Sequence, residues 1–301
     1  MKPSAFEYHA PRSVEEAVGL LSELGDDAKV LAGGQSLVPM LAMRLAVFGH
    51  LVDVTRIPEL RGVGPAADGS VTIGAATADT ALERDAGLGR TVPLLPRVTP
   101  LVGHFQIRNR GTLGGSVAHA DPAAEYPAVV LALDAELAAR SVRGERRLPA
   151  AGFFDGLWST ALAPDELLTS ITFPVWSGRC GFGVAEFARR HGDFAIAGAV
   201  VGVELDGDDR MRRAAVGLFG LGPTPVRAGQ LEKEVGGRPV TDCDAAQLGA
   251  IAVSDLSDVP SDMNGTAAYR KRVGAAMVAR AWSSAVTEAQ QARSGQEVHH
   301  G

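Results

Sequence analysis

Residues 29–36 read KVLAGGQS, and this stretch decides how the first part of the chain folds. Its first four residues predict a buried strand, which the glycine pair ends. Ser36 can then cap a helix that runs to about residue 46, with Pro39 tolerated in its first turn. The stretch therefore predicts a strand joined tightly to the start of a helix.

The flanking segments continue this alternation. A strand is expected near 6–9, a helix over about 14–24 after the capping box that begins at Ser13, and another strand near 50–54. Strands and helices that alternate in this way predict an α/β unit with a small parallel sheet. We expect this unit to occupy residues 1–58.

The remainder of the chain predicts a different organisation, in which strands and helices are grouped separately. The chain as a whole is therefore expected to be α+β. In 59–175, the patterns predict strands at 69–75 and 167–173, a hairpin at 136–148, a helix capped by Thr77, a helix over 92–102, an extended loop over 103–121 and a helix capped by Asp121. In 176–290, an antiparallel meander (181–189, 198–205, 211–218) precedes helices at 226–234, 244–252 and 266–289. A polar tail is expected at 291–301.

Composition excludes several classes of function. The net charge is −6 and the basic residues are scattered, which argues against nucleic acid and anionic membranes as partners. The first residues hold no secretory apolar stretch and no run reaches the length of a membrane span, so we expect a cytoplasmic protein. Cys180 and Cys243 are too few for a four-cysteine zinc site or for an iron–sulfur cluster held by about four thiolates, and the seven histidines show no ligand spacing. Any redox chemistry is expected from an organic cofactor.

The glycine pair Gly33-Gly34 is the first candidate site. Glycines permit a close approach of backbone N–H groups to an anion, and a helix start adds unpaired donors and partial positive charge. Gln35 and Ser36 supply further donors, which suits a diphosphate. The alternative is an ordinary strand–helix turn.

A second diglycine segment, Gly111-Thr-Leu-Gly-Gly-Ser116, follows about 80 residues later. Two such loops could clamp the phosphates of a dinucleotide from both sides. The alternative is a glycine-rich connection between packed elements. Neither segment matches the Rossmann fingerprint, and no P-loop pattern is present.

Acidic and aromatic residues complete the set. Asp121 and Glu125 can accept hydrogen bonds from ribityl hydroxyls or a ring N–H, or can serve only as helix-capping groups. Phe194 lies in a Gly192–Ala195 turn, where it can cover a flat cofactor or pack in the core. Arg108 is expected to pair with acidic residues and position its loop.

Together, residues 30–45, 106–125, 192–195 and 268–272 resemble the FAD-binding medium subunit of the carbon monoxide dehydrogenase and xanthine dehydrogenase group. The resemblance implies a two-subdomain FAD-binding fold of the vanillyl-alcohol-oxidase (PCMH) type, followed by a smaller C-terminal domain. It implies noncovalent FAD, since no histidine for covalent attachment is identifiable. The cofactor-binding residues that it implies are Leu31, Ala32, Gly33, Gly34, Gln35, Ser36, Leu37, His104, Gly111, Thr112, Gly114, Gly115, Ser116, Ala118, Asp121, Glu125, Leu168 and Phe194.

The resemblance also implies partners and an electron path. A large molybdopterin subunit would oxidise the substrate, and a small subunit with two [2Fe–2S] clusters would carry electrons to FAD. Glu125 stands where many relatives have Asp, and Phe194 where the carbon monoxide enzymes have Tyr, which argues against carbon monoxide as the substrate. The alternatives are a stand-alone flavin oxidoreductase and a flavin-free scaffold.

Overall fold

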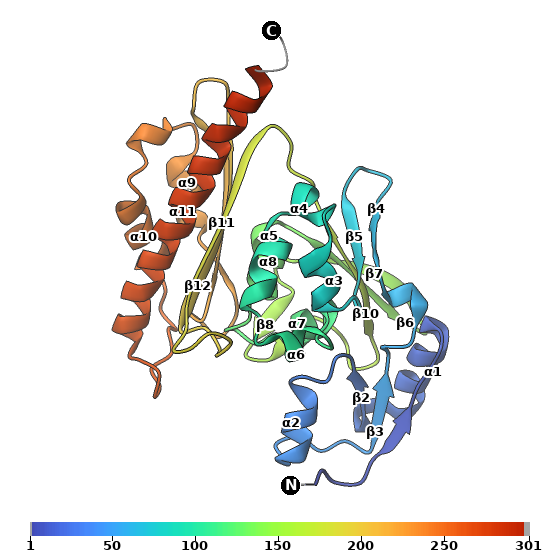
Figure 1. Ribbon diagram of the computed structural model, residues 1–301. Helices are drawn as coiled ribbons and strands as arrows, with labels where there is room; N and C mark the ends of the chain where they lie inside the picture. The colour runs from blue at the N-terminus through green and yellow to red at the C-terminus, as the bar shows by residue number, and fades with distance from the viewer. Residues whose placement is uncertain (1, 298–301) are drawn as a thin grey trace.

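The computed structural model describes residues 2–297, with side chains through residue 292, and arranges them in three layered parts (Figure 1). The first part holds β1 (Glu7–His9), α1 (Val14–Leu24), β2 (Ala28–Leu31), α2 (Leu37–Ala42) and β3 (His50–Asp53). Its three strands pair in parallel in the order β1-β3-β2, so the predicted parallel α/β unit is confirmed.

Of the two helix caps predicted in this part, one is confirmed and one is wrong. Ser13 caps α1 as predicted, because its hydroxyl accepts from the Glu16 N–H at 3.1 Å. Ser36 does not cap α2: its backbone is already helical and its side chain makes no capping bond. The turn begins earlier, where Val38 N–H donates to Gly34 C=O. The helix also ends at Ala42, since Arg44 takes a left-handed φ of 57°.

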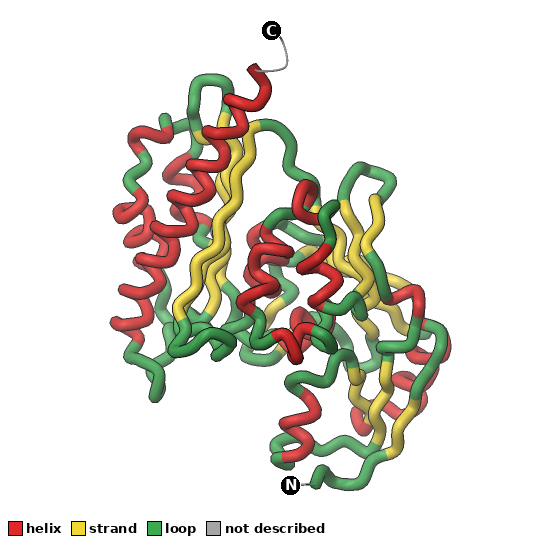
Figure 2. Tube along the Cα trace, in the orientation of Figure 1, coloured by secondary structure: helices red, strands yellow, loops and turns green. Residues whose placement is uncertain are grey.

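The middle part is an antiparallel sheet covered by short helices (Figure 2). The strand order is β4-β5-β10-β6-β7. Its strands are β4 (Val63–Pro65), β5 (Val71–Gly74), β6 (Glu136–Ser141), β7 (Gly144–Pro149) and β10 (Leu167–Phe173), with a separate hairpin of β8 (Phe154–Gly156) and β9 (Ser159–Thr160). Its helices are α3 (Asp79–Arg84), α4 (Leu88–Thr91), α5 (Leu94–Val98), α6 (Phe105–Arg108), α7 (Leu113–His119) and α8 (Glu125–Ala132).

The predicted extended loop over 103–121 is wrong, because α6 and α7 lie inside it. The error came from taking glycines as loop residues. In α7 the Thr112 hydroxyl caps the helix and the glycines allow it to pack closely, so tertiary contact overrides their low helix propensity.

The predicted caps Thr77 and Asp121 are also wrong. The Thr77 hydroxyl hydrogen-bonds with the Gly62 backbone instead, and α3 begins two residues later at Asp79. Asp121 closes a local turn by accepting from the Ala123 N–H at 2.9 Å, so α8 begins only at Glu125. The expected helix over 92–102 is broken into α5 and a 3₁₀ turn at Thr99–Leu101.

The C-terminal part is a sheet with a helical layer on its outer face. The predicted meander is confirmed: β11 (Arg179–Phe187), β12 (Ala197–Leu205), β13 (Met211–Phe219) and β14 (Val226–Arg227) are antiparallel neighbours in this order. The helices α9 (Gly229–Val235), α10 (Ala245–Ser254) and α11 (Ala267–Glu297) follow. α11 extends past the expected end at residue 289, and the remainder of the predicted tail, 298–301, lies outside the described residues.

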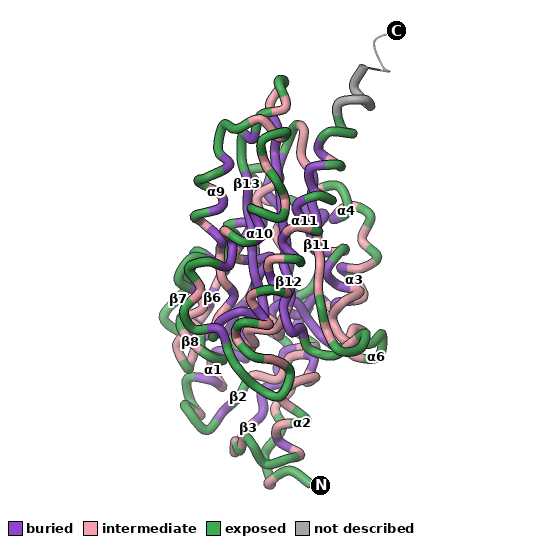
Figure 3. The backbone as a smooth tube through the Cα atoms, turned by 90° about the vertical axis from the view of Figure 1, so that its left-hand side faces the viewer, coloured by how far each residue is buried: buried purple, intermediate pink, exposed green. Residues whose placement is uncertain are grey.

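This sheet joins two hydrophobic cores. Val200, Ala215 and Phe219 belong to one core with the middle part, whereas Val201 and Val216 belong to another with α9–α11. Every residue of β12 is buried, as Figure 3 shows by its purple colour. Because one face of the sheet packs on the middle part, the loop between β11 and β12 starts and ends beside that part. Among the described residues, no helix is long and apolar enough to span a membrane.

Candidate functional site

A cavity of about 850 Å³ lies where the three parts meet. The segments around both glycine pairs, the β9–β10 connection and the Gly192–Phe194 turn line it. Of the candidate residues, all but Leu31 and His104 are in its wall: Ala32, Gly33, Gly34, Gln35, Ser36, Leu37, Gly111, Thr112, Gly114, Gly115, Ser116, Ala118, Asp121, Glu125, Leu168 and Phe194.

The two glycine segments touch each other inside this cavity. A Cβ added at Gly33 would lie 2.1 Å from the carbonyl oxygen of Arg110 and 2.8 Å from the Cα of Gly111. A Cβ added at Gly115 would lie 3.1 Å from the Cβ of Ala32. Segments about 80 residues apart in the sequence thus form one continuous wall, as a clamp on a single ligand requires.

The first segment presents unused backbone donors. Gly34 has a φ of 75°, a conformation that glycine adopts without strain. Among the described residues, the amides of Gly34, Gln35 and Ser36 have no backbone acceptor. The Gln35 side chain folds back and donates to Gly33 C=O at 2.8 Å, which stiffens the turn. The cradle therefore offers several N–H groups beside a helix start, which suits an anionic group.

The second segment differs from the expectation that its amides clamp an anion. Gly114 N–H donates to Ala75 C=O at 2.9 Å, and Gly115 N–H donates to the Thr112 hydroxyl oxygen at 3.0 Å. These donors are therefore committed within the protein. What the segment can offer a ligand is the hydroxyl hydrogens of Thr112 and Ser116 and a flat, close-packed wall.

Two carboxyl groups lie in the cavity wall close to α7. Glu125 is 8% exposed; burial, and next the charge of Glu186, raise its pKa to about 8. Asp79 is 2% exposed, and burial raises its pKa to about 7. Its Oδ1 is buried with no hydrogen-bond partner among the described residues. Glu125 is therefore protonated at neutral pH and Asp79 is partly so, so both can donate as well as accept hydrogen bonds.

Apolar and aromatic side chains form the other walls. Leu168 is 4% exposed, at a register shift where β10 pairs with β6, a bulge that turns the strand at the cavity. Phe194 is 71% exposed. Of the two alternatives from the sequence, packing in the core is therefore wrong, and presentation of the ring by a turn is confirmed. The turn depends on Gly192, whose φ is 85°.

Two candidates stand behind the wall. Leu31 packs under the first glycine segment, with its Cδ1 3.3 Å from where a Gly34 Cβ would lie. The ring of His104 lies against Gly192, whose added Cβ would be 2.8 Å from Cε1. They support the loops and do not line the cavity. Arg108 pairs with Glu83 at 2.9 Å, which agrees with its expected positioning role.

Sequence reasoning missed several lining residues. Asp79 is one, because its position in the first turn of α3 has the ordinary appearance of a helix-start acid. Trp158 is another: it is 58% exposed, has a φ of 54° and stacks on His119 with ring centroids 6.5 Å apart. The sequence around Trp158 carries no signal of this placement, which depends on the β8–β9 hairpin. Lys29 and Phe48 also line the cavity, with the Lys29 ammonium 5.7 Å from the Phe48 ring centroid.

The comparisons with known proteins agree with this geometry. Residues 4–176 match the family described as the FAD binding domain in molybdopterin dehydrogenase, and residues 183–285 match the CO dehydrogenase flavoprotein C-terminal domain. The chain belongs to this family. It is an FAD-binding medium subunit of the molybdenum hydroxylase family, an oxidoreductase group whose molybdenum and iron–sulfur centres lie on other subunits, as expected from the sequence.

Its relatives match along nearly the whole chain. The 6-hydroxypseudooxynicotine dehydrogenase complex subunit alpha of Paenarthrobacter nicotinovorans is 39% identical, over 96% of this chain and 97% of that one. The carbon monoxide dehydrogenase medium chain of Hydrogenophaga pseudoflava is 38% identical, over 95% and 98%. A structure of carbon monoxide dehydrogenase from Hydrogenophaga pseudoflava aligns with a TM-score of 0.92, 37% identity and coverage of 96% and 99%. The expected fold class is confirmed.

The residues present fit the family's cofactor. The cavity has the volume of a large ligand site, the first segment leaves amides open beside a helix start, and Gly33 stands where no larger residue fits. The orphaned Asp79 Oδ1 adds a buried polar atom in the wall. An elongated nucleotide with a diphosphate in its middle would fill the cavity, accept hydrogen bonds from the open amides and offer polar groups to the carboxyl groups in the wall.

Proposed function

We propose that this chain holds FAD noncovalently in the cavity, with the diphosphate at the first glycine segment. The open amides of Gly34, Gln35 and Ser36 support this placement, and Thr112 and Ser116, which carry hydroxyl groups, line the same cavity. The observation that carries the proposal is the contact between the two glycine segments in the wall of one cavity.

The flavin ring would then lie toward Asp121, Glu125, Leu168 and Phe194. Leu168 would provide an apolar floor, and Phe194 would cover the ring from the C-terminal part. A protonated Glu125 would donate a hydrogen bond to a ring acceptor, which a carboxylate cannot do. The role of these residues is to bind, orient and exclude water.

The chain would act as the electron carrier of a complex. FAD can exchange single electrons with an iron–sulfur cluster and electron pairs with an external acceptor, which is the redox chemistry that the bound cofactor supplies. We infer a large molybdopterin subunit and a small [2Fe–2S] subunit as partners, in a heterotrimer that dimerises. The cytoplasmic location expected from the sequence is part of this proposal.

Exposed apolar side chains beside the cavity support a partner. In residues 37–48, Leu37, Met40 and Phe48 line the cavity. The same segment leaves Val38, Met43, Leu45 and Val47 between 48% and 71% exposed. Such a cluster is typical of a surface that another chain covers.

The binding site is tested by two matched glycine substitutions. Gly33→Ala places a methyl group against the Arg110 carbonyl, whereas Gly19→Ala in α1 meets nothing within 4 Å. In the purified full-length chain, we expect Gly33→Ala to lose bound flavin, measured as flavin absorbance per protein, and Gly19→Ala to retain it. Thermal melting of both variants separates loss of binding from loss of folding. Full flavin content in Gly33→Ala would refute the site.

The partners are tested by co-purification. The chain is expected to elute with iron and molybdenum when it is isolated under mild conditions from its own cells, in a complex found in the cytoplasmic fraction. Leu45→Glu with Val47→Glu is expected to release the chain from the complex while flavin stays bound, because both side chains are exposed and neither lines the cavity. A chain that purifies alone with flavin and oxidises a small molecule directly would favour the stand-alone oxidoreductase.

A further inference from the structure

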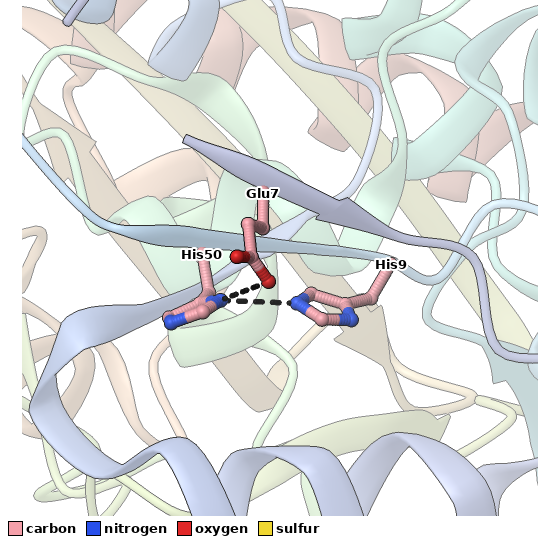
Figure 4. A group of neighbouring side chains, drawn as sticks. All are labelled: Glu7, His9 and His50. Carbon is pink, nitrogen blue, oxygen red and sulfur yellow. Dashed lines mark hydrogen bonds and ion pairs between the residues drawn. The ribbon is translucent and has the colours of Figure 1, made fainter. Parts of the chain in front are cut away.

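Glu7, His9 and His50 form a side-chain cluster outside the cavity. Glu7 and His9 are two residues apart on the edge strand β1, so their side chains lie on the same face. His50 is the direct partner of Glu7 on β3, in a parallel register. Figure 4 shows the three side chains converging on that face of the sheet.

The distances within the cluster suit a shared ion. His9 Nε2 lies 3.1 Å from His50 Nδ1, and His50 Nδ1 lies 3.6 Å from a Glu7 carboxylate oxygen. All three ligand atoms lie within 4.8 Å of one another. Ligands about 2.0–2.1 Å from a tetrahedral zinc ion are separated by roughly 3.3 Å, a spacing between these 3.1 Å and 3.6 Å distances.

Asp27 supports the cluster from the neighbouring segment. Its Oδ1 accepts from the N–H of Gly49 at 2.8 Å. Because Gly49 directly precedes His50, this bond holds the carboxylate close to His50. Its Oδ2 lies 3.9 Å from His50 Nε2, at ion-pair range. A carboxylate on this side favours the tautomer with hydrogen on Nε2 and leaves Nδ1 free as a ligand, as in carboxylate–histidine–zinc arrangements.

We propose that Glu7, His9 and His50 bind a divalent transition-metal ion of the zinc type, with Asp27 as a supporting carboxylate and water in the remaining position. Two imidazoles and one carboxylate are a ligand set of such ions and not of magnesium or calcium, which prefer oxygen. The side chain of Glu7 is 76% exposed, so the ion can enter from solvent. The site would tie the edge strand β1 to β3 and is independent of the flavin.

The test uses the chelator-treated, flavin-loaded full chain and Zn²⁺ as the probe. His299 and His300 near the C-terminus are a second possible ligand pair, so the reference protein carries His299→Asn and His300→Asn. Calorimetric titration of this reference is expected to show one Zn²⁺ per chain and a raised melting temperature. Magnesium is expected to give neither effect.

Adding His9→Asn and His50→Asn is expected to abolish this binding, and Asp27→Asn to weaken it about tenfold, the usual effect of a supporting carboxylate. Asn at position 27 can still accept the Gly49 N–H, and flavin content reports that each variant is folded. Zinc binding unchanged by the His9 and His50 substitutions, or no binding by the reference, would overturn the proposal. The 3.1 Å contact would then be a hydrogen bond between two rings.

Discussion

The two diglycine segments have similar sequences and different structures. Gly33-Gly34 lies in a turn, with Gly34 at a φ of 75° and open amides. Gly114-Gly115 lies inside α7, where both amides are bonded within the protein. The first pair needs glycine for its backbone conformation and for the contact with Arg110, and the second needs glycine for packing. A glycine pair therefore indicates that a Cβ would be unfavourable, but it does not distinguish backbone conformation from close packing as the reason.

The largest expected effect comes from a bulky residue in the second pair. A Cβ at Gly114 would lie 2.4 Å from the Cβ of Ala75 and 2.7 Å from its backbone, so neither side can yield easily. Gly114→Val is expected to lower the free energy of unfolding by about 4 kcal/mol, measured by urea unfolding. A native-like stability in this variant would show that α7 can shift, and the contrast between the two segments would fail.

A carboxyl group beside the second segment gives the next effect. The pKa of Glu125 rises on folding from its ordinary value of 4.5 to about 8, through burial and then the charge of Glu186. The folded chain keeps this proton while the unfolded chain has released it, so the contribution to stability is full below pH 4.5 and is lost as pH rises through about 8.

Glu125→Gln keeps the shape of the side chain and removes this titration. Between pH 5 and 7.5, the flavin-free parent should lose roughly 3 kcal/mol more stability than the variant, because each pKa unit is worth about 1.4 kcal/mol. Asp79 and Glu186 also have raised pKa values and add to the slope of both proteins, so the difference between the two curves reports on Glu125 and its coupling to them. Parallel stability curves for the two proteins would mean that Glu125 is ionised in the fold.

The first segment should respond differently to substitution. Gly34→Ala forces a left-handed conformation on alanine, at a cost of about 1–2 kcal/mol. In the folded chain the turn can relieve this strain only by moving its amides, so flavin affinity should fall about tenfold while the melting temperature changes little. Flavin titration and thermal melting of the same samples check this. If Gly34→Ala lowers the melting temperature and leaves flavin affinity unchanged, then the first pair, like the second, needs glycine for packing and not for binding.

Sequence patterns predicted most of the strands well, because residue alternation is a local property. They did not predict β4, β8, β9 or β14, and β14 lies inside the helix expected over 226–234. The helix start at Ser13 and β10 (Leu167–Phe173) have the expected bounds. Three wrong capping predictions fall near the cavity: Ser36, Thr77 and Asp121 do not cap the helices assigned to them. In each case the local signal gave way to a nearby turn or a long-range partner, which the sequence around the residue does not contain.

The candidate site was predictable to the extent that its residues lie in the two glycine segments. Asp79 and Trp158 were missed because they reach the cavity only through the packing of α3 and of the β8–β9 hairpin. The histidine pair was missed for the same reason: His9 and His50 are 41 residues apart and meet only in the parallel register of β1 and β3. Spacing in the sequence reveals such sites when one element carries all the ligands.

The smallest expected effect separates capping from binding within the second segment. The Thr112 hydroxyl accepts from the Gly115 N–H and keeps its own hydrogen for a ligand. Thr112→Ala is expected to cost about 1 kcal/mol of stability as a lost cap and to weaken flavin binding. Thr112→Ser keeps the hydroxyl and should restore both. If the alanine variant loses stability alone, the second segment serves the site only by packing, and the anion is held by the first segment's amides.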